Sequence, residues 1–257
     1  MKKSVLVAGT AGLGGLVLAG VLAVSSGLVS TDVLDRVQVP GAGTDSAVLP
    51  LADDVDAPLY RAPAASRGAN RVPTVDSGWV RRTAEATGIP EPAVRAYGTA
   101  VLNLPDDGCA LGWTTLAGIG WVESQHGTID GRTLGDDGRS SEAILGPALN
   151  GVDFAAIPAT AESTLMHGDP TWDHAVGPMQ FIPSTWKRWG RDGDGDGVAD
   201  PHDLDDAAAS TAAYLCHDGH DLATSSGWNA AVFSYNHENA YVVSVFEAAD
   251  RYGRATS

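Results

Sequence analysis

The sequence predicts a mainly α-helical domain, and three observations support this fold class. Beyond Asp76, apolar residues recur at the three- and four-residue spacing of helices, in segments separated by clusters of glycine, proline and aspartate. No run of alternating apolar and polar residues is long enough to build a sheet. With 257 residues, of which 44% are hydrophobic and 19% charged, the chain has the composition of a globular protein. We therefore expect one helical core domain with appended segments.

Turn-forming residues separate the segments that carry the helical pattern. Gly88-Ile89-Pro90 divides the first two, because proline starts helices well but disrupts their interiors. Within residues 112–123, Leu116, Ile119 and Val122 have the spacing of a buried helix. The expected helices are 79–87, 91–102, 112–123, 183–189, 204–216 and 228–250. Residues 127–176 are rich in glycine, aspartate and proline, and we expect a long loop region there.

The N-terminal part of the chain predicts export. Residues 4–30 carry no charge and follow Lys2 and Lys3, which is the order of a signal peptide with a possible cleavage site at Ala23-Val24-Ser25. The same stretch is long enough for a membrane anchor, and both alternatives place the rest of the chain outside the cytoplasm. Residues 31–75 mix proline, alanine, glycine and aspartate without periodicity and are expected to form a flexible linker, although a trimmed pro-segment or plain disorder fits equally. The folded domain is then 76–257.

The charge balance argues against a nucleic-acid partner. The chain has 16 lysine and arginine residues against 32 aspartate and glutamate residues, a formal net charge of −16. Such a surface repels phosphate backbones and anionic lipid headgroups. We expect membrane contact only through the N-terminal segment, and a monomeric protein.

The two cysteines, Cys109 and Cys216, lie in the part expected to be exported. An oxidising compartment and an even count favour a disulfide. The alternative is a pair of buried free thiols, and two cysteines are too few for a metal site.

Glu123 is the first candidate for chemistry. It follows a nearly continuous apolar helix and precedes Ser124, Gln125, His126 and Gly127, so its carboxyl group is expected where a buried helix opens into a loop. Burial raises the pKa of a carboxyl group, which suits a general acid that protonates a glycosidic oxygen. Taken alone, a glutamate at a helix end is more often a structural hydrogen-bonding group.

Two further motifs offer groups that bind sugars. In residues 175–186 (AVGPMQFIPSTW), a glycine-proline turn leads to Gln180, whose amide could bond a sugar acetamido group, although its neighbours could equally be core residues. In residues 232–242 (VFSYNHENAYV), Tyr235, Asn236 and Tyr241 could offer stacking faces and polar tips, and ordinary helix packing is the alternative.

The most specific local signal is an acidic loop at residues 192–203 (DGDGDGVADPHD). Carboxylates at positions 1, 3, 5, 9 and 12 and a glycine at position 6 follow the register of an EF-hand calcium loop. The expected calcium ligands are Asp192, Asp194, Asp196, the backbone carbonyl of Val198, Asp200 and Asp203. Position 12 is aspartate rather than glutamate, whose longer side chain is the usual bidentate ligand. Since one such loop is present, we expect a structural rather than a regulatory calcium ion, and no organic cofactor.

Taken together, WVESQHG (121–127), AVGPMQFIPSTW (175–186), the acidic loop and SYNHENAYV (234–242) resemble the lytic murein transglycosylases. The resemblance covers roughly 76–252 and is closest to the membrane-bound B-type branch and its actinobacterial relatives. It implies a lysozyme-like α+β fold, calcium in the acidic loop, peptidoglycan glycan strands as substrate and Glu123 as the only acid/base. The residues that it implies along the sugar cleft are Ser124, Gln180, Tyr235, Asn236 and Tyr241.

That family cleaves the bond between N-acetylmuramic acid and N-acetylglucosamine and leaves a 1,6-anhydro end, so a second carboxylate is not needed. The sequence departs from the family pattern at 158–170 (PATAESTLMHGDP), where we assign no site residue. Two alternatives stay open. One is a hydrolytic muramidase with Glu162 or Asp173 as base, and the other is a non-catalytic wall-binding module stabilised by calcium.

Overall fold

The computed structural model describes residues 72–105, 108–152 and 154–257. The expected signal peptide or membrane anchor (1–30) and residues 31–71 of the expected linker lie outside these ranges. No helix in the described ranges has both the length and the apolar character needed to cross a membrane.

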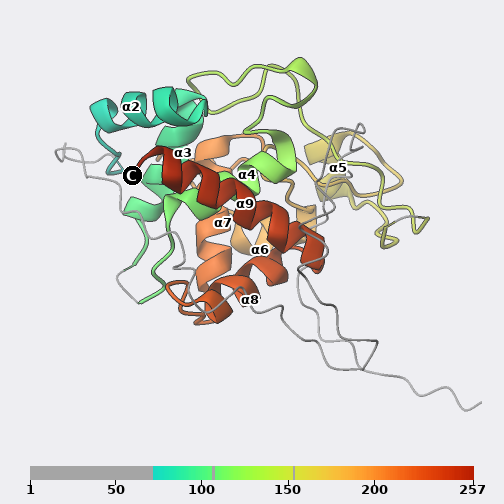
Figure 1. The fold of residues 1–257 in the computed structure, drawn as a ribbon. Coiled ribbons are helices and arrows are strands. Elements are labelled where there is room, and N and C mark those ends of the chain that lie inside the picture. The colour runs from blue at the N-terminus through green and yellow to red at the C-terminus, as the bar shows by residue number, and fades with distance from the viewer. Residues whose placement is uncertain (1–71, 106–107, 153) are drawn as a thin grey trace, which may run out of the picture.

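The described chain is mainly α-helical, as predicted, and is consistent with a lysozyme-like helical fold (Figure 1). Its extended segments make isolated β-bridges only, such as Leu145 with Val176 and Pro158 with Trp172. The helices are α2 (Ser77–Thr87), α3 (Glu91–Leu102), α4 (Trp113–Ser124), the 3₁₀ turn η1 (Ile129–Gly131), α5 (Ala161–His167), α6 (Pro183–Trp189), α7 (Leu204–Cys216), α8 (Ser225–Tyr235) and α9 (Asn239–Ala255).

Local chemistry explains most of the helix boundaries. The Asp76 side chain caps the start of α2 by accepting a 2.8 Å hydrogen bond from the Trp79 amide. Gly88 ends that helix in the left-handed conformation, with φ of 74°, which glycine adopts without a steric penalty. Proline lies at the beginning of both α3 and α6, where its missing N–H is not needed.

Two expectations about secondary structure are wrong. The predicted helix at 228–250 is broken at 236–238, because Asn236 and Glu238 have extended backbone conformations between α8 and α9. The predicted loop region at 127–176 contains the helix α5. Thr160 and Ser163 form a reciprocal capping box that starts this seven-residue helix.

Helix α4 lies at the centre of the core, where it packs mainly against α9, while α3 packs against α7 (Figure 1). All of its residues except Trp121 are buried. Two of its glycines allow this close packing. A Cβ atom at Gly118 would lie 2.7 Å from the Val245 carbonyl of α9, and one at Gly120 would collide with the Tyr97 hydroxyl of α3.

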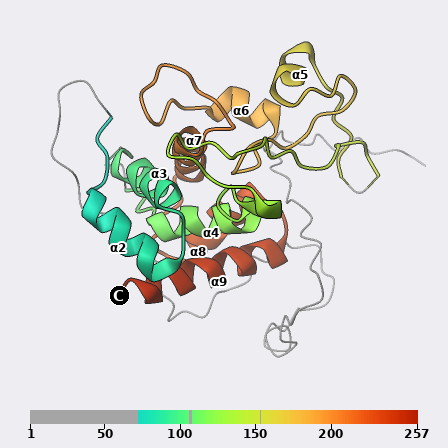
Figure 2. The ribbon, with the colours of Figure 1, turned by 90° about the horizontal axis from the view of Figure 1, so that it is seen from above.

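The long segment between α4 and α6 forms one edge of the molecule, together with α5 (Figures 1 and 2). Backbone hydrogen bonds join its middle to its C-terminal part, from the Gly146 amide to the Ala175 carbonyl and from the Gly177 amide to the Ile144 carbonyl. These bonds fix the approach to the turn that contains Gln180.

A disulfide joins Cys109 and Cys216, as predicted, with a Cα–Cα distance of 5.4 Å. It ties the segment that leads into α4 to the C-terminal end of α7. The alternative of two free thiols is therefore excluded.

Candidate active site

Glu123 lies in the last turn of α4, and its side chain is 3% exposed. Its Oε1 atom accepts a 2.7 Å hydrogen bond from the hydroxyl of Tyr241, in the first turn of α9. The chain then leaves the helix sharply, since Gln125 and His126 both have positive φ angles, 52° and 62°. The predicted burial of this carboxyl group at a helix end is thus present in the fold.

Ser124 connects the end of α4 to the glycine-proline turn. Its hydroxyl donates a 2.6 Å hydrogen bond to the Pro178 carbonyl and accepts a 2.8 Å bond from the Gly127 amide. The side chain is fully buried, so its contacts in this structure are with protein groups. A sugar contact by Ser124 stays a prediction.

Gln180 lies in that same turn with a positive φ angle of 49°. Its Nε2 atom donates a 2.8 Å hydrogen bond to the Gly177 carbonyl, and its Oε1 atom lies against Gly146. Backbone bonds between Val176 and Phe181, in both directions, close the turn. The turn thus presents a buried amide, as the sequence suggested.

Tyr235 and Tyr241 stack on each other with a centroid distance of 6.4 Å and an interplanar angle of 11°. Tyr235 is fully buried, and its hydroxyl donates to the Met179 carbonyl at 2.8 Å, so it links α8 to the turn before Gln180. Burial, followed by the charge of Glu123, raises the pKa of both tyrosines well above the usual value. Both hydroxyls therefore stay protonated donors across the physiological range.

Asn236 follows Tyr235 in extended conformation and is 4% exposed. Its Nδ2 atom is buried and has no hydrogen-bond partner among the described residues. A buried amide donor that lacks a partner is costly, and a ligand acceptor would remove that cost. Asn236 directly precedes the segment that carries Tyr241 and is thus placed close in sequence to the partner of Glu123.

The sequence did not reveal that His126, in the turn after Glu123, is held by hydrogen bonds to two tyrosines. His126 bonds the Tyr97 hydroxyl through Nδ1 at 3.0 Å and the Tyr252 hydroxyl through Nε2 at 2.9 Å. Burial lowers the pKa of His126 to about 3, and the charge of Arg251 adds to this effect. The neutral ring therefore fastens the turn after Glu123 to both α3 and α9.

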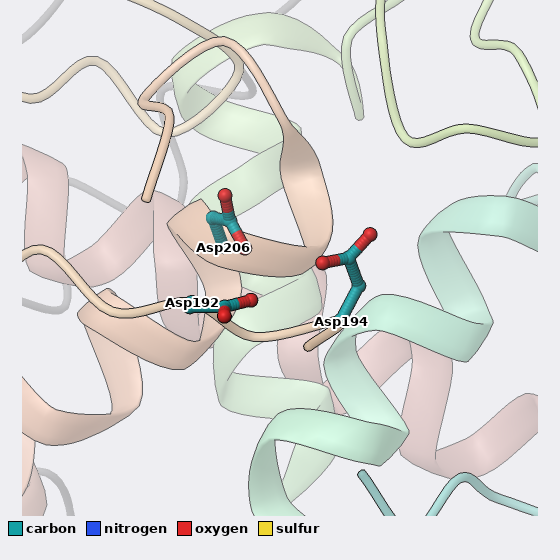
Figure 3. Close-up of side chains that lie close together, drawn as sticks. All are labelled: Asp192, Asp194 and Asp206. Atoms are coloured by element: carbon teal, nitrogen blue, oxygen red, sulfur yellow. The ribbon is translucent and has the colours of Figure 1, made fainter. Parts of the chain in front are cut away.

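The acidic loop brings two of the predicted calcium ligands, Asp192 and Asp194, close to Asp206, which the EF-hand register does not include. Oxygen atoms of Asp192, Asp194 and Asp206 all lie within 4.8 Å of one another (Figure 3). Asp206 belongs to α7 and accepts hydrogen bonds from the Gly193 amide at 2.7 Å and the Asp200 amide at 2.8 Å. Burial raises the pKa of Asp206 to about 6, and the charges of Asp194 and Asp192 contribute to the rise.

The other predicted calcium ligands lie around this cluster. The Asp196 side chain accepts a 2.7 Å bond from the Val198 amide, and the Val198 side chain is exposed. Asp200 pairs with Arg139 at 2.8 Å. Asp203 caps α7 by accepting from the Asp205 amide at 2.9 Å and lies 3.9 Å from Arg139. Asp203, the expected closing ligand, thus contacts protein groups, while Asp206 faces the start of the loop.

The two carboxylates considered as a second catalytic base are both paired. The Oδ1 atom of Asp173 lies 3.2 Å from Nε2 of His167, and both side chains are buried. Glu162 is exposed on α5 and pairs with Lys187 of α6.

Comparison with protein families matches residues 160–240 to the Transglycosylase SLT domain. The matched range includes Gln180, Tyr235, Asn236 and the acidic loop, and it ends one residue before Tyr241. This match supports a lytic transglycosylase family for that part of the chain. Comparisons with curated proteins and with solved structures give no match.

Proposed function

We propose that this chain is an exported peptidoglycan lytic transglycosylase of the B-type branch, with Glu123 as its single acid/base. The observation that carries the proposal is the buried Glu123 carboxyl group, hydrogen-bonded by Tyr241 and connected through Ser124 to the turn of Gln180. The match of residues 160–240 to a transglycosylase domain supports the same function independently of Glu123. The apolar N-terminal segment supports action outside the cytoplasm.

The reaction uses Glu123 twice. The protonated carboxyl group first gives its proton to the glycosidic oxygen as the bond from C1 of N-acetylmuramic acid to N-acetylglucosamine breaks. The resulting carboxylate then takes the proton from the 6-hydroxyl of the same muramic sugar, whose oxygen forms the new bond to C1. The products are a 1,6-anhydro end and a free 4-hydroxyl, and no water is consumed. The intramolecular attack is effective because the nucleophile is already held beside the reacting carbon.

The N-acetyl group of the muramic sugar would stabilise the positive charge at C1, as in other substrate-assisted glycosidases. Asn236 is suited to orient that group, since its Nδ2 atom is buried and has no partner among the described residues. Gln180 presents a second buried amide from the turn at Gly177, to whose carbonyl its Nε2 atom donates. The buried Ser124 and Tyr235 would act by holding the turn between them, through their bonds to the carbonyls of Pro178 and Met179.

We also propose a structural calcium ion in the acidic loop. Carboxylate oxygens are the ligands that Ca²⁺ prefers, and three of them converge within 4.8 Å from Asp192, Asp194 and Asp206. The elevated pKa of Asp206 reflects burial near like charges, which a cation would relieve. Asp196 and the Val198 carbonyl complete the proposed set, with Asp206 in place of Asp203 as the closing ligand. The ion would join the loop to α7.

Product analysis tests the catalytic proposal. Purified peptidoglycan is digested with the wild-type protein, and the soluble fragments are separated and identified by mass. We expect 1,6-anhydro-muramic ends. Reducing ends alone would establish the hydrolytic muramidase instead.

Variants separate catalysis from binding. Glu123→Gln should release at least about a thousandfold less sugar than wild type while still binding the glycan, since the general acid is lost. Glu247→Gln, which changes an exposed glutamate of α9, is the matched control and should retain full activity. A wild-type protein that binds glycan and releases none would instead be the calcium-stabilised wall-binding module.

A further inference from the structure

His174 stands out because two acceptors flank its ring. Its Nδ1 atom lies 2.7 Å from the Gly146 carbonyl and its Nε2 atom 3.1 Å from Oδ2 of Asp169. A carbonyl and a carboxylate only accept hydrogen bonds, so both ring nitrogens must carry a proton to satisfy this geometry. The arrangement therefore selects the imidazolium form. The side chain is 15% exposed, so it can exchange its proton with solvent.

Asp169 is held as a charged acceptor. Its Oδ1 atom accepts from the Thr171 amide at 2.7 Å and from the Trp172 amide at 3.3 Å. These backbone bonds, together with His174, lower the pKa of Asp169 to about 2. The carboxylate is therefore ionised at physiological pH.

A second histidine packs on the same ring without competing for its acceptors. The His167 ring, from the end of α5, lies 5.2 Å from that of His174. Its Nδ1 atom accepts from the Asp169 amide, and its Nε2 atom faces the carboxylate of Asp173. Asp169 is thus the carboxylate that faces His174, while Asp173 faces His167.

The carbonyl that His174 contacts is that of Gly146, which lies next to the side chain of Gln180. The Gly146 amide donates to the Ala175 carbonyl at 2.8 Å, and a Cβ atom at Gly146 would lie 2.8 Å from Oε1 of Gln180. Movement of Gly146 would therefore change the space beside the Gln180 amide. The His174 ring reaches this space indirectly, through its contact with the Gly146 carbonyl.

We propose that His174 is a positioning residue for glycan binding: its imidazolium bridges Asp169 and the Gly146 carbonyl and so holds Gly146 against the Gln180 turn, and loss of the proton releases Gly146. The inference rests on the proposed function, because it takes the Gln180 turn as part of the glycan site. It makes glycan affinity, rather than the chemistry at Glu123, depend on the charge of His174.

Calorimetric binding tests this proposal without interference from cleavage. The probe is a peptide-free tetrasaccharide of alternating N-acetylglucosamine and N-acetylmuramic acid, titrated into the Glu123→Gln protein between pH 5 and 8. We expect affinity to fall roughly tenfold as the pH rises across this range, about the effect of losing one charge-assisted hydrogen bond.

Two substitutions in the same background separate the two forms of His174. His174→Asn keeps one donor to Gly146 and imitates the neutral ring, so it should bind weakly at all pH values. His174→Arg keeps a permanent charge and donors for both acceptors, so it should bind tightly at all pH values. His220→Asn, which changes a histidine in the loop after α7, should retain the wild-type pH dependence.

The outcomes distinguish this inference from the proposed function. Equal pH dependence of binding in the Glu123→Gln protein and in its His174→Asn and His174→Arg derivatives would overturn the role of His174 while leaving the function intact. No binding by any protein, with no sugar released by wild type, would overturn both. The side-chain amide resonances of Gln180 give a second measurement on the unsubstituted protein. They should shift with the titration of His174, and resonances that do not follow it would also overturn the proposal.

Discussion

The Tyr241 hydroxyl donates a 2.7 Å hydrogen bond to Oε1 of Glu123, although the two residues lie 118 positions apart in the chain. The contact exists because α4 and α9 pack along each other, with Gly118 allowing the close approach of Val245. The same tyrosine ring stacks on Tyr235, whose hydroxyl holds the turn before Gln180. Tyr241 thus joins the candidate acid/base, through Tyr235, to the turn before Gln180.

Tyr241→Phe removes this donor and keeps the stacking ring. A hydrogen bond to the carboxylate that Glu123 becomes when it gives up its proton contributes about 1.5–3 kcal/mol, so we expect kcat to fall by about ten- to a hundredfold. Release of soluble muropeptides measures the rate. Ser244→Ala, at an exposed position of the same helix, is the control and should leave the rate unchanged. An unaltered kcat in Tyr241→Phe would show that Glu123 does not need this bond.

His126 predicts a specific dependence of stability on pH. Its pKa of about 3 in the folded protein lies below its ordinary value of 6.5, so the unfolded chain binds a proton more readily than the folded one. The contribution of His126 to stability is therefore full above pH 6.5 and is lost as the pH falls toward 3. The loss is about 1.4 kcal/mol per pH unit within that window.

Urea unfolding of wild type and His126→Gln at pH 5.5 and 4.5 measures this effect. The variant should be less stable at pH 7, because Tyr97 and Tyr252 lose a well-placed partner. Its further loss between pH 5.5 and 4.5 should be smaller than that of wild type by about 1.4 kcal/mol. If the free energy of unfolding changes equally with pH in the two proteins, His126 binds a proton as readily in the folded protein as in the unfolded chain.

The local chemistry of the sequence predicted several helices residue for residue. Helices α3 and α6 begin at or next to prolines, and α7 begins after the capping residue Asp203, so their starts could be identified without tertiary information. Helix α5 was missed because its capping box uses Ser163 in place of the usual glutamate or glutamine. The break between α8 and α9 was missed because neither glycine nor proline occurs at 236–238.

The candidate site was predictable only where the signal is local. The apolar run before Glu123 predicted a buried carboxyl group, and its side chain is indeed buried. The bonds of Ser124 to Pro178 and of Tyr235 to Met179 depend on how distant elements pack, which no local pattern encodes. His174 was overlooked for the same reason, since Gly146 lies 28 positions before it.

The disulfide between Cys109 and Cys216 should contribute substantially to stability. It closes a loop with a sequence separation of 107, for which the chain-entropy argument gives about 4–5 kcal/mol. The double variant Cys109→Ser/Cys216→Ser should lose stability of that order in urea unfolding. Reduction of the wild-type protein should reproduce the loss, and a reducing agent should not affect the double variant, because the chain has no other cysteine. A loss below about 1 kcal/mol would mean that the unfolded chain is not constrained as expected.

The acidic loop allows a direct test between two registers for calcium. The sequence register ends at Asp203, whereas the fold places Asp206, one helical turn later, beside Asp192 and Asp194. Asp203 instead caps α7 and lies near Arg139. A calcium ligand needs a negative charge, whereas a helix cap needs only a hydrogen-bond acceptor. Loss of the charge of Asp206 should therefore weaken calcium binding more than loss of the charge of Asp203.

Calcium titration of Asp206→Asn and Asp203→Asn compares them. Asp206→Asn should weaken calcium binding at least about tenfold and should lose the rise in melting temperature that calcium gives the wild-type protein. Asp203→Asn should keep its calcium affinity, since asparagine also caps helices well. The reverse result would restore the register ending at Asp203. A ligand that binds the folded state must raise the melting temperature by mass action. A wild-type melting temperature that is equal in calcium and in chelator would therefore mean that the carboxylate cluster binds no calcium.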